Sequence, residues 1–213
     1  MLLRRPAIVA SLLTLALVSG CTTTSQGEPR PATTTDTSTS ISTPDTSDNG
    51  EELPFAGAPK VNDPLDTSRF EQDPCLSLTA DQAQSLSLPS TGATLENVAL
   101  GNGCGWKNSE TRGYVEIVFL VDDPRGLSPE YDANSRGKWA YFDELPNIEG
   151  YPAIARDGTD DRDIGHCSVL VGVADDMVFV SIVKLSQANV GQKDPCEVAA
   201  QVAGLALQTM KGA

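Results

Sequence analysis

The sequence predicts an α+β domain in which an antiparallel β-sheet packs with helices near its N-terminal and C-terminal ends. Residues 113–121, 166–174 and 177–185 are rich in the β-branched and aromatic residues that favour strands. Two Asp-Pro-Cys tripeptides, at 73–75 and 194–196, stand where helices are expected to begin. The resulting order of helix, strands, helix, strands, helix is typical of α+β proteins.

The first helical signals lie at the start of this domain. In Asp73-Pro74-Cys75, aspartate is a good N-cap, and proline suits the first helical position, where its missing N–H costs nothing. Thr79-Ala-Asp-Gln82 has the form of a capping box. It predicts a short helix that stops before Pro89.

The clearest strands form a hairpin. Every second residue of 166–174 is apolar and would share one face: Cys167, Val169, Val171 and Val173. Residues 177–185 follow as the partner strand across a turn at Asp175-Asp176. Shorter strands are expected at 104–106 and 151–155, and Ser128-Pro129 predicts a helix running toward Tyr141.

The second Asp-Pro-Cys begins the best-defined helix. Glu197 stands at the third helical position, as in a capping box. Val198, Val202 and Leu205 follow at helical spacing, with alanines beside them. We therefore predict an amphipathic helix over residues 195–210 that docks on an apolar surface.

The N-terminal residues indicate export. Residues 1–20 combine Arg4 and Arg5, an apolar run too short to span a bilayer and small residues at the end, which is typical of a signal peptide. Ser19-Gly20-Cys21 resembles a bacterial lipobox, in which the cysteine sulfur is acylated. We expect lipid, with palmitate-type chains, on Cys21 and a location on the extracytoplasmic face of the cell membrane.

Residues 21–60 are expected to be a disordered tether between the lipid and a globular domain at 61–213. Between residues 22 and 50, 18 of 29 residues are Ser, Thr or Pro. Such a segment cannot bury enough apolar surface to become ordered.

The net charge of −14, from 29 acidic and 15 basic residues, excludes the usual nucleic-acid binders, which present basic patches to phosphate. It also disfavours electrostatic attachment to an anionic bilayer. Contact with the membrane is therefore expected through the lipid alone.

The remaining cysteines, Cys75, Cys104, Cys167 and Cys196, are expected to form two disulfides, as an even number does in an exported protein. We favour Cys75–Cys196, which would join two similar helix starts, and Cys104–Cys167, which would join two strands. Pairing neighbours, Cys75 with Cys104 and Cys167 with Cys196, is also geometrically reasonable. The spacing disfavours zinc, and a reactive thiol is the other alternative.

No catalytic constellation is evident, and no metal or cofactor is expected. His166 is the only histidine, and the sequence contains no GxSxG, GxGxxG or GxxxxGK[ST] motif. The acidic residues of 157–163 are interpreted as a solvated loop, with weak calcium binding as the alternative.

Aromatic residues give the one candidate binding surface. Trp139, Tyr141 and Phe142 stand too close together to face one side, and exposed aromatic residues suit interfaces; burial of most of them is the alternative. Trp106 is expected to pack over a disulfide.

Several of these motifs together resemble an actinobacterial lipoprotein family catalogued as domain of unknown function 3558. The likeness rests on the lipobox, the polar tether, both Asp-Pro-Cys tripeptides, Cys104-Gly-Trp106, Gly150-Tyr-Pro152-Ala153 and Cys167 within an apolar strand. The resemblance implies a secreted cell-envelope lipoprotein with a small α+β domain, similar to the Mog1/PsbP-like sandwich. It supplies no catalytic residues.

The sequence thus predicts a lipid-anchored, non-catalytic binding or accessory module of the cell envelope, whose partner is an unidentified envelope protein or small apolar ligand. A carrier of a small apolar ligand is the first alternative, and a weak hydrolase or thiol oxidoreductase is the second.

Overall fold

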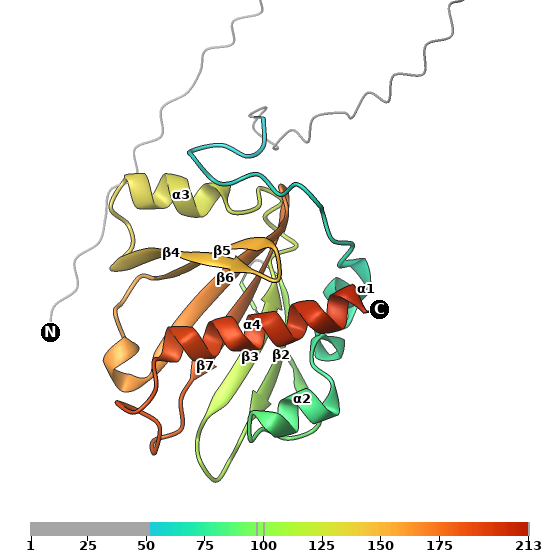
Figure 1. Ribbon diagram of the computed structural model, residues 1–213, viewed down its shortest axis with the longest axis vertical. Coiled ribbons are helices and arrows are strands. Elements are labelled where there is room, and N and C mark those ends of the chain that lie inside the picture. Colours follow the sequence, from blue (N-terminus) through green and yellow to red (C-terminus); the bar gives the residue numbers. More distant parts are fainter. Residues whose placement is uncertain (1–51, 97, 100, 213) are drawn as a thin grey trace, which may run out of the picture. The chain divides into compact units, whose positions relative to one another are not determined.

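The computed structural model describes residues 52–96, 98–99 and 101–212 of the 213-residue chain. The predicted signal peptide, Cys21 and the tether up to residue 51 lie outside the described residues. In the described part, seven strands form one sheet of order β1-β2-β3-β7-β6-β5-β4, and every neighbouring pair is antiparallel (Figure 1). The sheet and its helices confirm the α+β class.

The elements follow one another along the chain as predicted in outline. The strands are β1 (Ala93–Leu95), β2 (Asn102–Lys107), β3 (Tyr114–Phe119), β4 (Tyr141–Ile148), β5 (Tyr151–Asp157), β6 (His166–Ala174) and β7 (Met177–Lys184). The helices are α1 (Ser68–Gln72), α2 (Ala80–Ser85), α3 (Ser128–Ser135) and α4 (Pro195–Lys211), with 3₁₀ helices η1 (Pro74–Ser77) and η2 (Arg162–Ile164).

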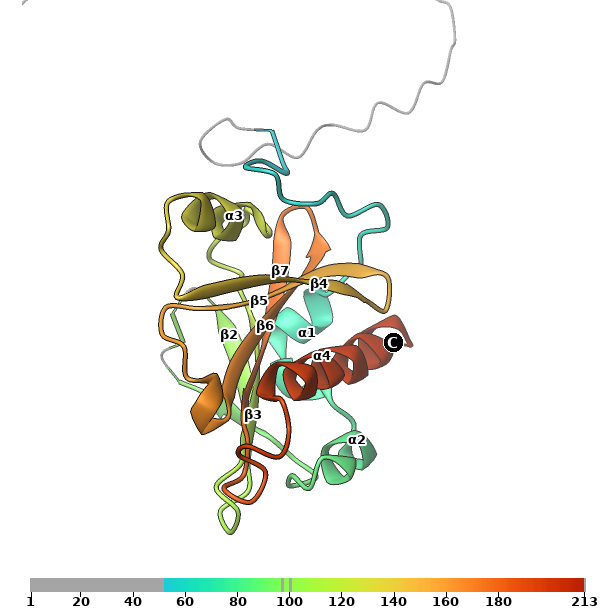
Figure 2. The same cartoon turned by 60° about the vertical axis from the view of Figure 1, so that its left-hand side comes forward.

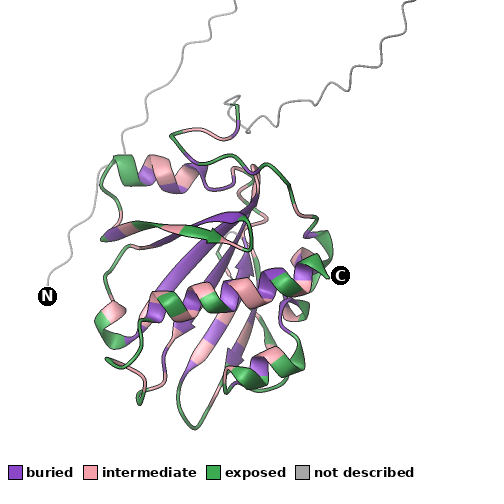
Figure 3. Cartoon of the chain, in the orientation of Figure 1, coloured by how far each residue is buried: buried purple, intermediate pink, exposed green. Residues whose placement is uncertain are grey.

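One face of the sheet, which we call the inner face, packs against α4 (Figure 2). The four alternating residues predicted in β6 all point to this side and are fully buried: Cys167, Val169, Val171 and Val173. Burial of each aliphatic side chain contributes roughly 1.5–3 kcal/mol. Ser181 of β7 adds a polar tie, because its hydroxyl donates to the backbone O of Ala199 in α4 at 2.9 Å. Figure 3 shows the buried central strands behind the half-exposed helix.

The opposite, outer face is covered at one end by α3 and by residues 52–60. Leu127, Ile154 and Leu170 are buried there in a second apolar cluster that also contains Ala58. The N–H of Phe55 donates to the Ser128 hydroxyl at 3.0 Å. The chain is therefore packed on the domain before the expected boundary at residue 61.

The helix starts agree with the predicted capping. Thr79 and Gln82 form a complete capping box at α2. The Asp194 carboxylate accepts from the N–H groups of Cys196 and Glu197 at the start of α4. Asp73 caps η1 in the same way, by accepting from the N–H of Cys75 at 3.3 Å.

The helix predicted from Ser128 toward Tyr141 is wrong in its second half. α3 ends at Ser135, and Gly137 adopts φ +65°, which an L-residue rarely takes. This conformation turns the chain, so that Tyr141 begins strand β4 instead.

The four cysteines of the described residues are paired, as expected, but the predicted nested pairing is wrong. The bonds are Cys75–Cys104, with Cα atoms 5.0 Å apart, and Cys167–Cys196, with Cα atoms 5.1 Å apart. Cys104 and Cys167 do share the inner face, but β3 and β7 lie between their strands. Three strand spacings amount to about 14 Å, twice what a disulfide can span.

Candidate functional site

The aromatic residues proposed as a binding surface flank the start of β4, but their side chains take different partners. The indole N–H of half-buried Trp139 donates to the backbone O of Glu130 at 3.1 Å, and the Arg156 guanidinium lies 4.3 Å from its ring. Phe142 is also half-buried, and its ring meets Tyr131 edge-on at 5.1 Å between centroids. Both rings are thus engaged within the domain.

Tyr141, the third aromatic residue, points to the other side of β4 and is buried in the inner core. Its hydroxyl donates to Sγ of Cys167 at 3.5 Å, and the Arg162 guanidinium lies 4.0 Å from its ring. Burial, reinforced by the carboxylate of Asp157, raises the pKa of Tyr141 to about 12. The three rings therefore do not form one exposed patch.

His166, the only histidine, lies beside an aspartate and a serine, but not in a catalytic order. Its Nδ1 is 3.6 Å from Oδ2 of Asp157, and the same oxygen accepts from the Ser168 hydroxyl at 3.1 Å. A serine triad needs the imidazole between serine and carboxylate. Here the carboxylate stands between the other two groups.

The acidic stretch at 157–163 is organised by one arginine. Arg162 holds both carboxylate oxygens of Asp160 at 2.7 Å and reaches Asp143 at 3.1 Å. These hydrogen bonds lower the pKa of Asp160. Among the residues that the structure describes, no group of three His, Cys, Asp or Glu side chains is placed to hold a metal ion.

A hollowed part of the described surface lies at the end of the sheet where the β2–β3 turn and the chain after β7 meet. Three adjoining hollows of about 400, 420 and 320 Å³ surround that turn. The first shares Thr111, Lys184 and Leu185 with the second, and Ser87 and Leu88 with the third. We call this continuous feature the end groove.

Short-range hydrogen bonds fix the rim of the end groove. Asn108 begins the β2–β3 turn, and its side-chain O accepts from the N–H groups of Glu110 and Thr111. Its side-chain N–H donates to the backbone O of Ser87 at 2.8 Å, which ties the turn to the end of α2. A Cβ at Gly113 would lie 3.2 Å from the N of Ser186, so glycine lets the turn approach the chain after β7.

Apolar side chains form the floor of the first hollow. Val115 of β3 and Val183 of β7 point to the inner face there, and Leu88 is buried beside them. Leu86, at the end of α2, and Val198 of α4 line its helical side. The hollow therefore opens into the layer between sheet and helices.

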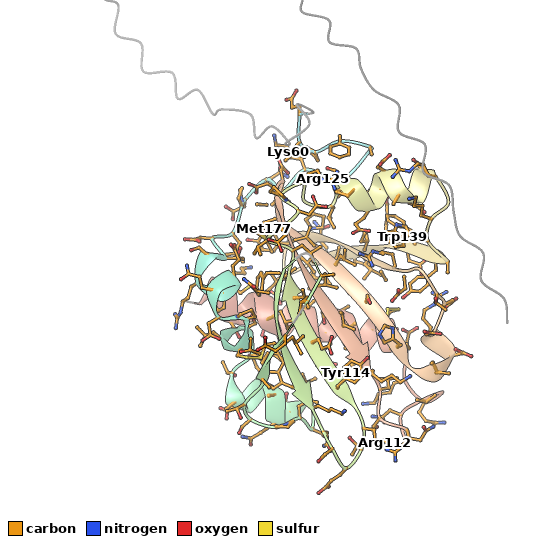
Figure 4. The ribbon with its side chains drawn as sticks, turned by 180° about the vertical axis from the view of Figure 1, so that it is seen from behind. Lys60, Arg112, Tyr114, Arg125, Trp139 and Met177 are labelled. Atoms are coloured by element: carbon orange, nitrogen blue, oxygen red, sulfur yellow. A yellow bond between two sulfur atoms is a disulfide. The ribbon has the colours of Figure 1, made fainter. Side chains whose placement is uncertain are left out.

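The charge of the end groove is opposite to that of the protein. It is lined by four cations and a single carboxylate: Lys107, Arg112, Lys184, Lys193 and Glu110. The whole chain has about two acidic residues for each basic one. Figure 4 shows Arg112 and Tyr114 at this end of the sheet, with Lys60 at the other end.

Sequence reasoning missed this groove, which is assembled from segments far apart in the chain. One signal could have drawn attention to it. Residues 177–193 contain two lysines and no Asp or Glu, an unusual run in so acidic a chain.

Comparison with known proteins gives a family but no function. A family model described as "Protein of unknown function (DUF3558)" matches residues 16–209. No curated protein and no solved structure matches the chain. In the described part of the chain, no helix is long and apolar enough to cross a membrane. Because the match covers most of the sequence, the chain belongs to the DUF3558 family of proteins of unknown function.

Proposed function

We propose that this protein is a cell-envelope lipoprotein, anchored by lipid on Cys21, that acts as a non-catalytic binding module. Its ligand is a small molecule held in the end groove. The observation that carries this proposal is the hollow of about 400 Å³ with Leu88, Val115 and Val183 at its floor. Ligand sites are typically concave and of this size.

The groove favours the carrier alternative over docking of an envelope protein on the aromatic residues. Trp139 and Phe142 are occupied by Arg156 and Tyr131, so they offer little free aromatic surface. Interfaces draw their affinity from exposed anchors that fill a partner's pocket. The end groove, in contrast, includes the half-exposed Ile164 and the half-buried Leu86 and Val198 in its lining.

The absence of a catalytic role rests on the polar groups around His166. Asp157 separates the histidine from Ser168, and the four cysteines of the described domain are bound in disulfides. Neither a serine nucleophile activated by imidazole nor a free thiolate is supported by this arrangement.

The position of the groove suits a tethered module. Residues 52–60 join the domain near the β6–β7 turn, where the N–H of Val61 donates to the Asp175 carboxylate at 2.8 Å. The end groove lies at the other end of β7, whose eight residues span about 23 Å (Figure 1). The chain that leads back to Cys21 thus joins the domain at the end that lies opposite the groove.

The test uses the uncharged dye Nile red and the mature chain from residue 21 with Cys21→Ser, so that no acyl chain competes for the dye. Ala188 is exposed and lines the first hollow. We expect Ala188→Trp to fill the hollow and weaken dye binding about tenfold or more, a loss of about 1.4 kcal/mol.

Ala140→Trp is the matched control, because Ala140 is exposed but lies away from the hollows. It should leave dye affinity unchanged. Absence of dye binding by the parent chain, or equal affinities of the two tryptophan variants, would contradict the proposed site.

A further inference from the structure

We propose that the end groove selects an anionic amphiphile, a molecule with one negatively charged head and a short apolar body. This assignment rests on the proposed function, because it names the ligand class of the same groove. It follows from three features of the described residues. These are the positions of Lys and Arg side chains without a carboxylate partner, the presence of two of them in one hollow, and the apolar surface beside them.

The first feature is the placement of cations that have no carboxylate partner. Of the 12 Lys and Arg residues in the described part of the chain, six lie within 4.0 Å of a carboxylate: Lys60, Arg125, Arg136, Arg156, Arg162 and Lys211. Four of the other six line the end groove: Lys107, Arg112, Lys184 and Lys193. In this acidic protein, most of the described Lys and Arg side chains without a carboxylate partner therefore lie around the end groove.

The second feature is that two of these cations share the apolar hollow. Lys184 and Lys193 both line the first hollow, whose lining contains no Asp or Glu. Lys184 also donates to the backbone O of Ile164 at 2.7 Å, which holds its ammonium group at the rim. An ammonium has three N–H donors, so at least two remain for a ligand.

The third feature is exposed apolar surface beside the charges. Ile164, half exposed at 50%, lines the second hollow together with Val190 and Leu185. A ligand with an apolar body would cover Ile164 and the half-buried Val190 and Val198 while its head meets the lysines. A purely polar anion would leave these surfaces in water, so the lining favours an amphiphile.

The net negative charge of the protein does not prevent this selection. At 0.15 M salt the Debye length is about 8 Å, so carboxylates beyond that distance are largely screened. The lining of the first hollow itself supplies two cations and no carboxylate to a head placed there. Charge-assisted hydrogen bonds to the head are about twice as strong as neutral ones.

The experiment compares three probes of equal chain length on the mature Cys21→Ser chain at 0.15 M salt: decanoate, decanol and decylammonium. If the groove recognised only the apolar chain, decanol would bind best, because its uncharged head group loses the least hydration energy on binding. We expect the opposite order, with decanoate about threefold to tenfold tighter than decanol and decylammonium weakest.

Substitution of Lys193 distinguishes the contribution of its charge to ligand binding from that of the shape of the groove. Lys193 is exposed, so Lys193→Gln should not disturb folding. It should weaken decanoate binding severalfold and leave decanol binding unchanged. Lys138→Gln, at an exposed lysine that lines none of the hollows, is the matched control and should change neither.

The outcomes distinguish the two proposals. Equal binding of decanoate and decanol, or no effect of Lys193→Gln, would overturn the anionic assignment and leave the binding module in place. If none of the three probes binds and Nile red does not bind either, the groove is not a ligand site, and the proposed function fails with it.

Discussion

At the scale of single residues, intramolecular partners decide whether a side chain is available for binding. Tyr141 is the clearest case. Its position between Trp139 and Phe142 suggested exposure, yet its hydroxyl donates to the disulfide sulfur of Cys167. The sequence shows that three rings are close together but not which partners each finds. Those partners come from β6, α3 and the loop before β6, all distant in sequence.

The raised pKa of Tyr141 gives a prediction about alkaline pH. Burial raises its pKa to about 12 in the folded protein, against 10 in the unfolded chain. Between these values the folded state keeps a proton that the unfolded state loses, so stability falls as the pH rises from 10 toward 12. We expect Tyr141→Phe to reduce this loss.

The measurement is the urea midpoint of both proteins at pH 9, 10 and 11. The midpoint of the wild-type chain should fall more steeply than that of Tyr141→Phe. Identical pH dependence would show that the hydroxyl is not buried as described.

At the scale of elements, the sequence correctly predicted the strands and the helix whose buried side chains form a recognisable pattern. The predicted hairpin is β6–β7, whose strands are buried almost throughout, and the predicted C-terminal helix is α4, whose buried positions repeat with the period of a helix. The capping residues Thr79 and Asp194 also act locally, so their roles could be inferred directly.

Strand β4 could not be found in this way, because it is an edge strand. Only one side of it pairs, and its sequence from Tyr141 to Ile148 mixes Asp143, Glu144 and Pro146 with apolar residues. Charge and proline are common in edge strands, where they prevent association with other sheets. Its pattern therefore lacks the alternation that identifies strands.

Disulfide pairing failed for a related reason, because it depends on strand order. Sequence placed Cys104 and Cys167 correctly in strands facing the same side. It did not show that β7, the last strand in the chain, inserts between β3 and β6. That insertion separates the two cysteines and leaves each to bond a nearby helix start.

The bond between Cys167 and Cys196 ties α4 to β6, and its removal gives a prediction. It closes a separation of 29 residues, so the chain-entropy relation assigns it roughly 3–4 kcal/mol. The double variant Cys167→Ala/Cys196→Ala should lose about that much free energy of unfolding in urea titrations.

Peptide mapping under non-reducing conditions is the companion measurement. It should recover a peptide that joins residues 75 and 104 and another that joins 167 and 196. A peptide joining 75 to 196 would contradict the described pairing.

At the scale of the whole molecule, the end groove illustrates what no local pattern can show. Its lining comes from the end of α2, the β2–β3 turn, the loop before β6, the chain after β7 and the first turns of α4. Each segment has the sequence of an ordinary loop or helix end. Their meeting depends on the sheet order, so the site emerges only from the complete fold.

The lipid anchor is the whole-molecule prediction from the N-terminal sequence. Cys21→Ala removes the thiol that would carry the lipid. We expect the variant to stay unprocessed or to leave the membrane fraction for the soluble fraction, because acyl chains supply about 0.8 kcal/mol per buried methylene. The assay is cell fractionation followed by detection of the protein's size. A processed variant that remains membrane-bound would contradict lipidation.

The central claim, that the end groove is the binding site, is tested most directly by mapping amide chemical shifts during titration with decanoate. The mature Cys21→Ser chain is suited to this measurement, because amides around the groove and around the aromatic residues can be followed in one experiment. We predict saturable shifts concentrated at residues 85–88, 111–115 and 183–193, with Trp139 and Phe142 unaffected. Shifts centred on Trp139 and Phe142, or no saturable shifts anywhere, would contradict it.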